Sequence, residues 1–404
     1  MIGNKYIIMI NIKNFLFGLV LCASAFQIIK FYSFYLEYSA WQYSDWLINY
    51  QGGFVRRGLI GEILFKLHNF FSIRLDFLVL LLVIFLYVLL ALLIIKSLKY
   101  LKNSKLDTLI FLSPGFFIYP IMNSGLSGRK EILLYVIIGL FVFFEEKIKS
   151  KYLLGIIIFS IFFTSLTHSG LLFYIPYLIF IFLLVKIERD KKLKYTELFI
   201  ILLSMLSVLL LITFNQGSKL QVIEICSSIK SFVLDDCPNE GQFFWLAVPV
   251  KDHIGFKSLT DLSDFRTLLV YFISLILVFI FIGIKLFYSK FKTNSFFINK
   301  LNPFIILPLL FFFTIPIYFL GLDWGRYISM SYFCSYFIYI FCIKKKLLVF
   351  NFNKNKINFN LSKKKFLVVV LFYSLCWTFP IYNANNFKFP LKKPLLQFQK
   401  ILKK

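Results

Sequence analysis

Acidic residues are scarce in this chain, and that scarcity already excludes some classes of protein. Only 19 of its 404 residues are Asp or Glu, against 45 Lys and Arg, and charged residues make up 16% of the sequence. A soluble domain carries about a quarter charged residues. An ordinary soluble fold is therefore excluded.

The chain also lacks the short motifs that mark common cofactor and metal sites. It has no Walker motif, no dinucleotide fingerprint, no His-Glu-x-x-His and no paired-aspartate signature after its first apolar run. It contains 3 His, and the spacing of its 6 cysteines matches no zinc pattern. We therefore expect neither a metal nor an organic cofactor.

Apolar residues, in contrast, are abundant. They form 59% of the sequence, aromatic residues form 20%, and the mean hydropathy is +0.80. Apolar runs of membrane-spanning length alternate with short lysine clusters, the positive-inside pattern of a multi-pass membrane protein. The net charge of +26 thus indicates no nucleic-acid groove. We expect an all-α membrane bundle with an outward-facing cavity, in which residues 1–404 form a single integral membrane domain.

About eleven segments have the composition of spans, each near the roughly 20 residues that a crossing helix needs. Pro114-Gly115 and Pro120 interrupt one of them, which predicts a broken or re-entrant helix there. The expected spans lie near residues 11–32, 75–96, 106–122, 131–146, 151–167, 169–186, 196–214, 266–286, 303–321, 326–343 and 365–381.

The lysine clusters predict the orientation. With eleven spans, all lysine-rich loops between them face the cytoplasm and the N-terminus lies inside. The lysine-rich C-terminal tail would then lie outside, which contradicts this topology mildly. A large loop at residues 215–265 is expected on the outer face. It holds Cys226 and Cys237, whose spacing allows a disulfide worth about 2–3 kcal/mol in an oxidising compartment.

The longest polar stretch follows the first apolar span directly. It contains Asp45, Arg56 and Arg57, together with the aromatic residues Trp46 and Tyr50. Arginine near a bilayer is costly unless it meets an anion or a carboxylate, and an aromatic ring can stack on a sugar. Asp45 could accept a proton from a sugar hydroxyl. Two plainer interpretations stay open: a lipid-headgroup anchor, and an ion pair that only folds the loop.

Two further outer-face groups are candidates. Arg129, in Gly128-Arg129-Lys130-Glu131, could bind a phosphate, because a basic residue at a helix start opposes the helix dipole and is poorly explained by capping. His168, in a tight turn between spans, could move protons near neutral pH. A hydrogen-bonded structural histidine is the alternative there.

A fourth group lies near the end of the chain. Residues Asp323, Trp324, Arg326 and Tyr327 share one short turn between two spans. A plain connecting turn needs only a glycine. An acid, an arginine and two aromatic residues in this turn therefore indicate a site. Interfacial belt residues are the alternative for Trp324 and Tyr327.

With these groups in view, the chain resembles bacterial surface-polysaccharide polymerases of the O-antigen polymerase type and the related exopolysaccharide-polymerisation membrane proteins. The resemblance is architectural and rests on Gly-Gly-Phe-Val-Arg-Arg-Gly, Gly-Arg-Lys-Glu and Asp-Trp-Gly-Arg. It implies metal-independent transfer of a glycan from undecaprenyl pyrophosphate at the periplasmic face of the inner membrane. It also implies a flippase and a chain-length regulator as pathway partners. The implied phosphate ligands are Arg56, Arg57, Arg129 and Arg326.

Two other functions stay open. A carboxylate in the first outer loop is typical of C-type glycosyltransferases that use lipid-linked sugars, and Asp45 would be that residue. A lipid-linked-oligosaccharide flippase is the non-catalytic alternative, although the candidate charges gather at one face rather than at the bilayer midplane. The side of the membrane on which repeat units accumulate in a null strain separates a flippase from a polymerase.

The most demanding expectation joins the two ends of the chain. Asp323 and Arg326 should converge with Asp45 and Arg56 around one outward-open cavity, because opposed charges around an aqueous pocket stabilise each other. Asp45, His168 and Asp323 are then the candidate catalytic residues. The expected sugar-stacking residues are Trp46, Tyr50, Trp324 and Tyr327.

Overall fold

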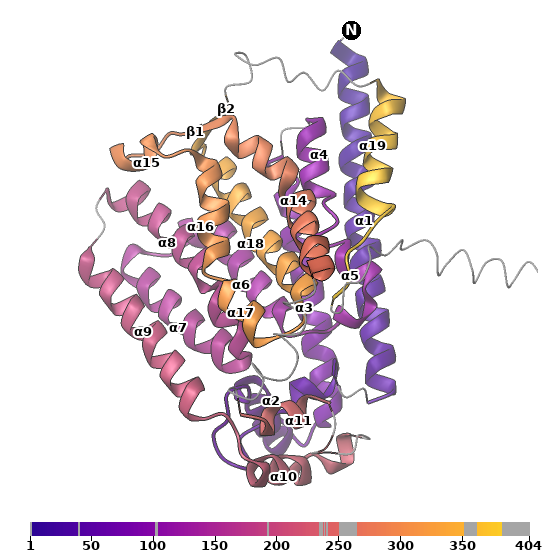
Figure 1. Ribbon diagram of the computed structural model, residues 1–404, viewed down its shortest axis with the longest axis vertical. Coiled ribbons are helices and arrows are strands. Elements are labelled where there is room, and N and C mark those ends of the chain that lie inside the picture. Colours follow the sequence, from indigo (N-terminus) through magenta and orange to yellow (C-terminus); the bar gives the residue numbers. More distant parts are fainter. Residues whose placement is uncertain are drawn as a thin grey trace, which may run out of the picture. The chain divides into compact units, whose positions relative to one another are not determined.

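The computed structural model of the protein describes residues 2–38, 41–101, 104–191, 194–233, 237, 239, 241–249, 265–350 and 362–381. Figure 1 shows the helices of the chain, which groups into two compact units. Unit 1 comprises residues 1–16, 97–123 and 257–404, and unit 2 comprises residues 17–96 and 124–256. Helix α1 (Ile2–Leu36) contributes to both.

Within the described residues, eight helical segments are long and apolar enough to cross a membrane. This confirms the predicted class, an all-α multi-pass membrane protein. The other three predicted spans form shorter helices, of which the longest has 14 residues, fewer than the roughly 20 that a straight crossing needs. The eight segments cover residues 12–36, 75–97, 150–167, 169–190, 195–214, 265–287, 303–320 and 324–344.

In unit 2, the central helix is α7, which packs against α2, α6, α8 and α9. The helices of this unit are α2 (Leu59–Phe71), α3 (Leu75–Ser97), α6 (Glu131–Phe144), α7 (Ser150–Thr167), α8 (Ile175–Asp190), α9 (Tyr195–Phe214), α10 (Lys219–Ser228) and α11 (Gly241–Ala247). Short 3-10 turns join them: η1 (Ser44–Leu47), η2 (Ser124–Leu126), η3 (Glu145–Lys147), η4 (Ser169–Tyr174) and η5 (Lys230–Phe232).

In unit 1, α18 (Trp324–Lys344) forms the core: every residue from Trp324 to Cys342 is buried. Its neighbours include α14 (Phe265–Phe287) and α17 (Ile315–Leu320). Strands β1 (Ser289–Phe291) and β2 (Leu348–Phe350) pair antiparallel, with Lys290 opposite Val349. The remaining elements are α4 (Lys105–Phe111), α5 (Tyr119–Met122), α15 (Phe296–Lys300), η7 (Pro303–Ile305), α16 (Ile306–Phe312) and α19 (Lys363–Leu375).

The predicted break in the third segment is present. Helix α4 ends at Phe111, just before Pro114, and α5 begins only at Tyr119. A broken helix leaves backbone carbonyls without helical partners, which is tolerated only where protein or water covers them. Here α18 supplies hydroxyls: Tyr332 donates to the Ile110 carbonyl at 2.6 Å, and Ser329 donates to the Gly115 carbonyl at 2.8 Å.

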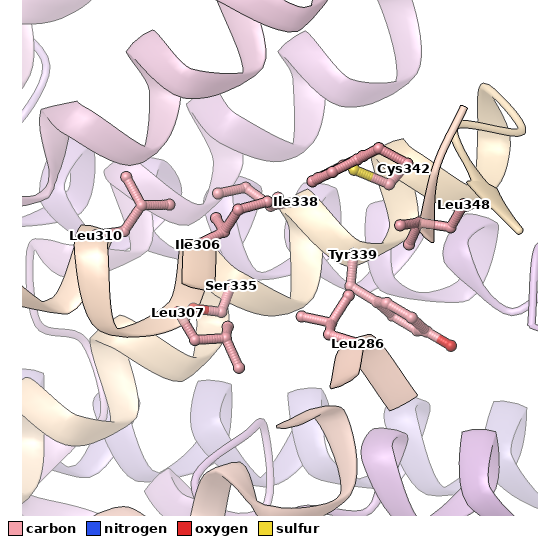
Figure 2. A pocket seen from close by; sticks show the side chains of 10 residues that line it. Leu286, Ile306, Leu307, Leu310, Ser335, Ile338, Tyr339, Cys342 and Leu348 are labelled. Carbon is pink, nitrogen blue, oxygen red and sulfur yellow. The ribbon is translucent and has the colours of Figure 1, made fainter. Parts of the chain in front are cut away.

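Unit 1 also contains a narrow pocket between α14, α16, α18 and the two strands (Figure 2). Its walls are mainly Leu and Ile side chains, and none of its ten lining residues is charged. Its hydroxyl groups come from Ser335 and Tyr339, and the Tyr339 hydroxyl donates to Asp107 at 2.7 Å. The pocket therefore offers no group suited to charged chemistry.

Candidate functional site

The polar stretch after α1 folds into a buried loop. Ser44–Leu47 forms the single turn η1, which packs against α2 and α11. Trp46 is fully buried, and its indole N–H donates to the Gly128 carbonyl at 2.6 Å. Asp45, next to it, is only 2% exposed. This loop is thus part of the core of unit 2 rather than a surface connector.

Lys130 is the partner of Asp45. Its side chain is fully buried, and its Nζ lies 3.6 Å from Asp45 Oδ1. The same ammonium group donates to the carbonyls of Arg57 and Thr167, both at 3.2 Å. One lysine therefore joins the first loop, the start of α6 and the end of α7.

The electrostatics of Lys130 are unusual. Burial lowers its pKa from 10.5 to about 8, Asp45 opposes this shift, and the nearby Arg57 adds to it. A buried charge without compensation is costly, so the Asp45 carboxylate and the two carbonyls stabilise the ammonium form. The pair is an anion and a cation held side by side in a water-poor place.

Arg56 is engaged by α11. Its guanidinium Nη2 donates to the Trp245 carbonyl at 2.8 Å and the Val248 carbonyl at 3.4 Å. These carbonyls lie in the last turn of α11 and just beyond it, where helices lack internal donors and arginine often substitutes. Arg56 is 2% exposed, and burial, followed by the charge of Arg57, lowers its pKa to about 9. Its phosphate-binding role stays a prediction, and that role requires α11 to release it.

Arg57 is more accessible. Its side chain is half-buried, and its Nη1 donates to the Gln242 side-chain oxygen in α11 at 2.8 Å. A neutral amide is a weaker partner for a guanidinium than a phosphate. Of the two adjacent arginines, Arg57 is the more exposed, and its phosphate-binding role stays a prediction.

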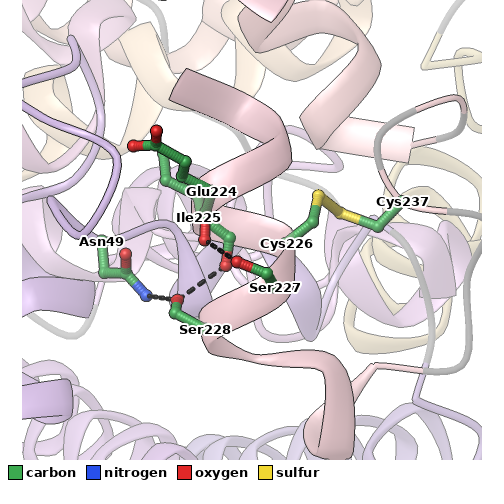
Figure 3. The surroundings of a disulfide bond; sticks show 7 residues. All are labelled: Asn49, Glu224, Ile225, Cys226, Ser227, Ser228 and Cys237. Atoms are coloured by element: carbon green, nitrogen blue, oxygen red, sulfur yellow. Dashed lines mark hydrogen bonds between the residues drawn. A yellow bond between two sulfur atoms is a disulfide. The ribbon is translucent and has the colours of Figure 1, made fainter. Parts of the chain in front are cut away.

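Helices α10 and α11 together cover the first loop, and we call residues 218–233 and 241–249 with Cys237 the cover. A disulfide joins Cys226 and Cys237, the predicted pair, with Cα atoms 5.8 Å apart (Figure 3). Asn49 of the first loop donates to Ser228 at 3.0 Å, two residues after Cys226. Gly52 lies so close to the Gln221 backbone that a Cβ at this position would collide with it. The Gly-Gly sequence thus lets the loop pack against α10.

Arg129 and His168 also lie in unit 2, next in sequence to Lys130 and Thr167. The Arg129 side chain is half-buried, its guanidinium lies 5.9 Å from the Trp41 ring, and its Nε donates to the Gly125 carbonyl at 3.4 Å. His168 is 6% exposed and follows Thr167, whose carbonyl contacts Lys130. Its backbone N–H donates to the Thr164 carbonyl and closes the end of α7.

The predicted stacking residue Tyr50 is half-buried. Its ring lies 4.9 Å from the Phe54 ring, and its backbone N–H donates to Glu62 at 3.0 Å. Burial, followed by the charge of Glu62, raises the pKa of Tyr50, so its hydroxyl stays protonated. Gly58 packs directly against this ring, with no room for a Cβ. Tyr50 can offer an edge to a sugar, whereas Trp46 is packed on all sides.

The fourth predicted group lies in unit 1, where its side chains contact one another and Tyr318. Arg326 Nη1 and Asp323 Oδ2 are 3.0 Å apart at the start of α18. The Trp324 indole donates to the Tyr318 carbonyl at 2.9 Å, and the ring of Tyr327 packs edge-on against the Tyr318 ring. Trp324 and Tyr327 are 5% and 4% exposed, which is typical of packed core rings. Their stacking role stays a prediction.

Within unit 2, Lys130 thus joins Asp45 to the backbone of Arg57 and to Thr167, the neighbour of His168 in sequence. Arg56 and Arg129 are adjacent in sequence to Arg57 and Lys130. Their predicted convergence with the Asp323 group of unit 1 stays a prediction. Within the described residues, no three His, Cys, Asp or Glu side chains lie close enough to hold a metal ion.

Sequence reasoning missed Lys130 as the centre of the site. It lies in the Gly128–Glu131 motif, where only Arg129 was assigned a role. The available signal was the unfavourable position of a lysine at a helix start, with a lone carboxylate in the preceding outer loop.

The chain matches no protein-family model, and comparisons with curated proteins and with solved structures also find no match. The geometry of the site therefore carries the functional argument.

Proposed function

We propose that this membrane protein is a glycosyltransferase that polymerises lipid-linked oligosaccharide repeat units for an O-antigen or a capsule. The donor is a glycan on undecaprenyl pyrophosphate, and the acceptor is the sugar hydroxyl of another repeat unit. The reaction takes place in a cavity open to the periplasmic face of the inner membrane, within a bundle of about eleven spans. The resemblance noted from the sequence supplies the substrate class.

One observation carries the proposal: the buried Asp45–Lys130 pair in the loop after the first span. Asp45 Oδ1 accepts no hydrogen bond from the described part of the chain, so it keeps a lone pair for an incoming hydroxyl proton. Lys130 places a positive charge beside this carboxylate, and the charge of Arg57 lies close enough to Lys130 to lower its pKa. A base beside cations suits a reaction in which a hydroxyl attacks and an anion leaves.

The proposed step is a displacement at the anomeric carbon of the donor sugar. The acceptor hydroxyl gives its proton to Asp45, and its oxygen forms the new glycosidic bond. The bond from the anomeric carbon to the pyrophosphate oxygen breaks, and undecaprenyl pyrophosphate leaves with the electron pair. His168 then passes the proton from the site to water.

The cations stabilise the negative charge that grows on the leaving pyrophosphate. Arg57 and Arg129 are half-buried, and each can form paired hydrogen bonds with phosphate oxygens. Arg56 supports the same group when the cover moves. Because Asp45 is 2% exposed, the substrate enters only after the cover opens.

Complementation of a deletion strain tests the proposal. The native protein should restore a ladder of surface polysaccharide on a gel, and Asp45→Asn should leave a single capped repeat unit with normal amounts of protein in the membrane. Asp76→Asn is a matched control, because Asp76 is a buried carboxylate of the same unit, paired with Arg74 at 2.7 Å. It should keep the ladder. A full ladder from Asp45→Asn would refute the proposal.

A second candidate function is favoured by the position of Asp45 in η1, soon after the first span ends. This position suits a C-type glycosyltransferase that adds single sugars from a lipid-linked donor. The deletion strain separates the two: loss of one sugar from every repeat unit indicates single-sugar transfer, whereas loss of chain length indicates polymerisation. Repeat units that accumulate on the cytoplasmic side would instead indicate a flippase.

A further inference from the structure

Helix α2 has an apolar stripe that the rest of unit 2 does not cover. Ile63, Leu67 and Phe70 recur at intervals of four and three residues, so they share one side of the helix. Ile63 is 39% exposed, Leu67 37% and Phe70 81%. Neighbouring Phe71 is 58% exposed. Such a contiguous apolar surface marks an interaction site rather than a water-facing one.

The adjacent side of α2 anchors the helix to the bundle. Ile60 and Leu64 are both 5% exposed, and the helix packs against η1 and α7. Gly61 lies against the Ile48 carbonyl without room for a Cβ. The exposed stripe therefore belongs to a helix that is fixed in place.

The turn after α2 separates it from the membrane-spanning helix α3. Ser72 adopts a left-handed conformation with φ of 53°, which ends α2. The His68 ring nitrogen contacts the Ile73 carbonyl at 2.6 Å, and Arg74 pairs with the buried Asp76 at 2.7 Å. Helix α3 then begins at Leu75. The stripe thus ends four residues before a helix that is long and apolar enough to cross a membrane.

The charged residues beside the stripe suit lipid headgroups. The side chains of Lys66 and Arg74 are 76% and 71% exposed, while Lys66 also pairs with Glu62 at 3.5 Å and Arg74 with Asp76 at 2.7 Å. Asn69 and Glu62 lie on the same polar side of the helix as Lys66. An apolar stripe bordered by cations is typical of a helix in the interfacial plane of a bilayer. A protein partner would be expected to cover the cations with acids as well.

We propose that α2 is an interfacial membrane anchor, whose stripe of Ile63, Leu67, Phe70 and Phe71 lies in the acyl boundary of the leaflet at which α3 begins. Lys66 and Arg74 contact phospholipid phosphates there. The anchor holds the first loop, which follows α1 and precedes α2, at the membrane surface. This inference is independent of the glycosyltransferase proposal.

Photocrosslinking tests it in the full chain, reconstituted in vesicles of phosphatidylethanolamine and phosphatidylglycerol. p-Benzoylphenylalanine replaces Phe70 in one variant and Asn69, on the polar side, in a matched control. A third variant carries it at Leu206, which is 52% exposed on the spanning helix α9 and reports that lipid adducts are detectable. Mass spectrometry of the irradiated protein identifies each adduct.

The expected result is a phospholipid adduct at positions 70 and 206 and several-fold less at position 69. Three results would overturn the proposal. An adduct at position 70 with a second copy of the chain would identify an oligomer interface. Equal lipid adducts at positions 69 and 70 would show no orientation, and no adduct at position 70 with a clear one at 206 would place the stripe away from lipid.

Discussion

Two buried aspartate–lysine pairs, one in each unit, differ in how well the fold explains them. In unit 1, Asp107 lies in the first turn of α4 and Lys285 in the last turn of α14, 3.0 Å apart. Both charges thus complement the dipoles of their helices. The Tyr339 hydroxyl donates to the same carboxylate oxygen at 2.7 Å, which leaves only Asp107 Oδ2 without a partner in the described chain.

The pair in unit 2 lacks these explanations. Lys130 precedes α6 directly, where a cation opposes the helix dipole, and Asp45 lies in a single 3-10 turn. Their nearest atoms are 3.6 Å apart, longer than a hydrogen bond. A buried ion pair is weak support for stability even with good geometry. The comparison therefore separates the two pairs: Asp107–Lys285 fastens helices, whereas Asp45–Lys130 is the pair for which we propose a role in chemistry.

The largest expected effect is on stability. Replacing only the lysine of each pair should destabilise the protein, and replacing both partners should reverse most of the loss. Lys130→Met and Lys285→Met should each destabilise the protein by about 3–5 kcal/mol, because a buried carboxylate loses its cation. The double variants Asp45→Asn/Lys130→Met and Asp107→Asn/Lys285→Met should regain most of that stability. Thermal unfolding in detergent measures the cycle.

The two double variants should differ in activity. Asp107→Asn/Lys285→Met should keep the polysaccharide ladder, whereas Asp45→Asn/Lys130→Met should have none. A ladder from Asp45→Asn/Lys130→Met would show that Asp45–Lys130 has only a structural role, like Asp107–Lys285.

The next largest effect separates the two adjacent arginines. Arg57→Ala should lower the rate of chain extension by about 10²–10³, the typical cost of losing one charge-stabilising donor. Arg57→Lys should recover only part of it, because an ammonium lacks the planar fork of a guanidinium. The measurement is the initial rate of polymer formation with purified protein and lipid-linked repeat units.

Arg56→Ala should affect stability as well as rate. It leaves the carbonyls of Trp245 and Val248 without their donor, at a cost of about 1–3 kcal/mol. Equal losses of stability in Arg56→Ala and Arg57→Ala would contradict the difference between them.

The sequence predicts the features that depend on residues close together in the chain. It does not predict contacts between residues that are far apart in the chain. Apolar runs and lysine loops predict the membrane class, and Pro114-Gly115 predicts the break between α4 and α5, because both depend on local composition. The Asp45–Lys130 contact depends on packing across 85 positions, and no local pattern reports it. The burial of Trp46 was missed for the same reason, since its partner is the distant Gly128 carbonyl.

A pH series tests the role of Lys130 further. As the pH rises, the stability that this group contributes should increase and the activity should fall. Burial lowers the pKa of Lys130 from 10.5 to about 8, so the folded protein binds fewer protons than the unfolded chain between these values. Stability contributed by this group should therefore rise with pH across that window. Polymer formation, which uses the charged lysine, should fall about tenfold per pH unit above pH 8.

Lys130→Arg supplies the control for this series. A guanidinium has a higher pKa than an ammonium in the same surroundings, so the fall in activity should shift to higher pH. An unchanged alkaline limit in Lys130→Arg would assign the titration to another group.

The smallest effect is expected from the disulfide of the cover. In the chain-entropy model, a loop of this length gives about 3 kcal/mol. Here Asn49, Arg56 and Arg57 also hold the cover, so Cys226→Ala/Cys237→Ala should lower the apparent unfolding free energy by about 2 kcal/mol or less and leave the ladder intact.

Thiol labelling in membranes measures directly whether the disulfide is formed. Cys226 and Cys237 should react only after reductant. Labelling of both cover cysteines without reductant would show an open pair and would remove the argument for an oxidising outer compartment.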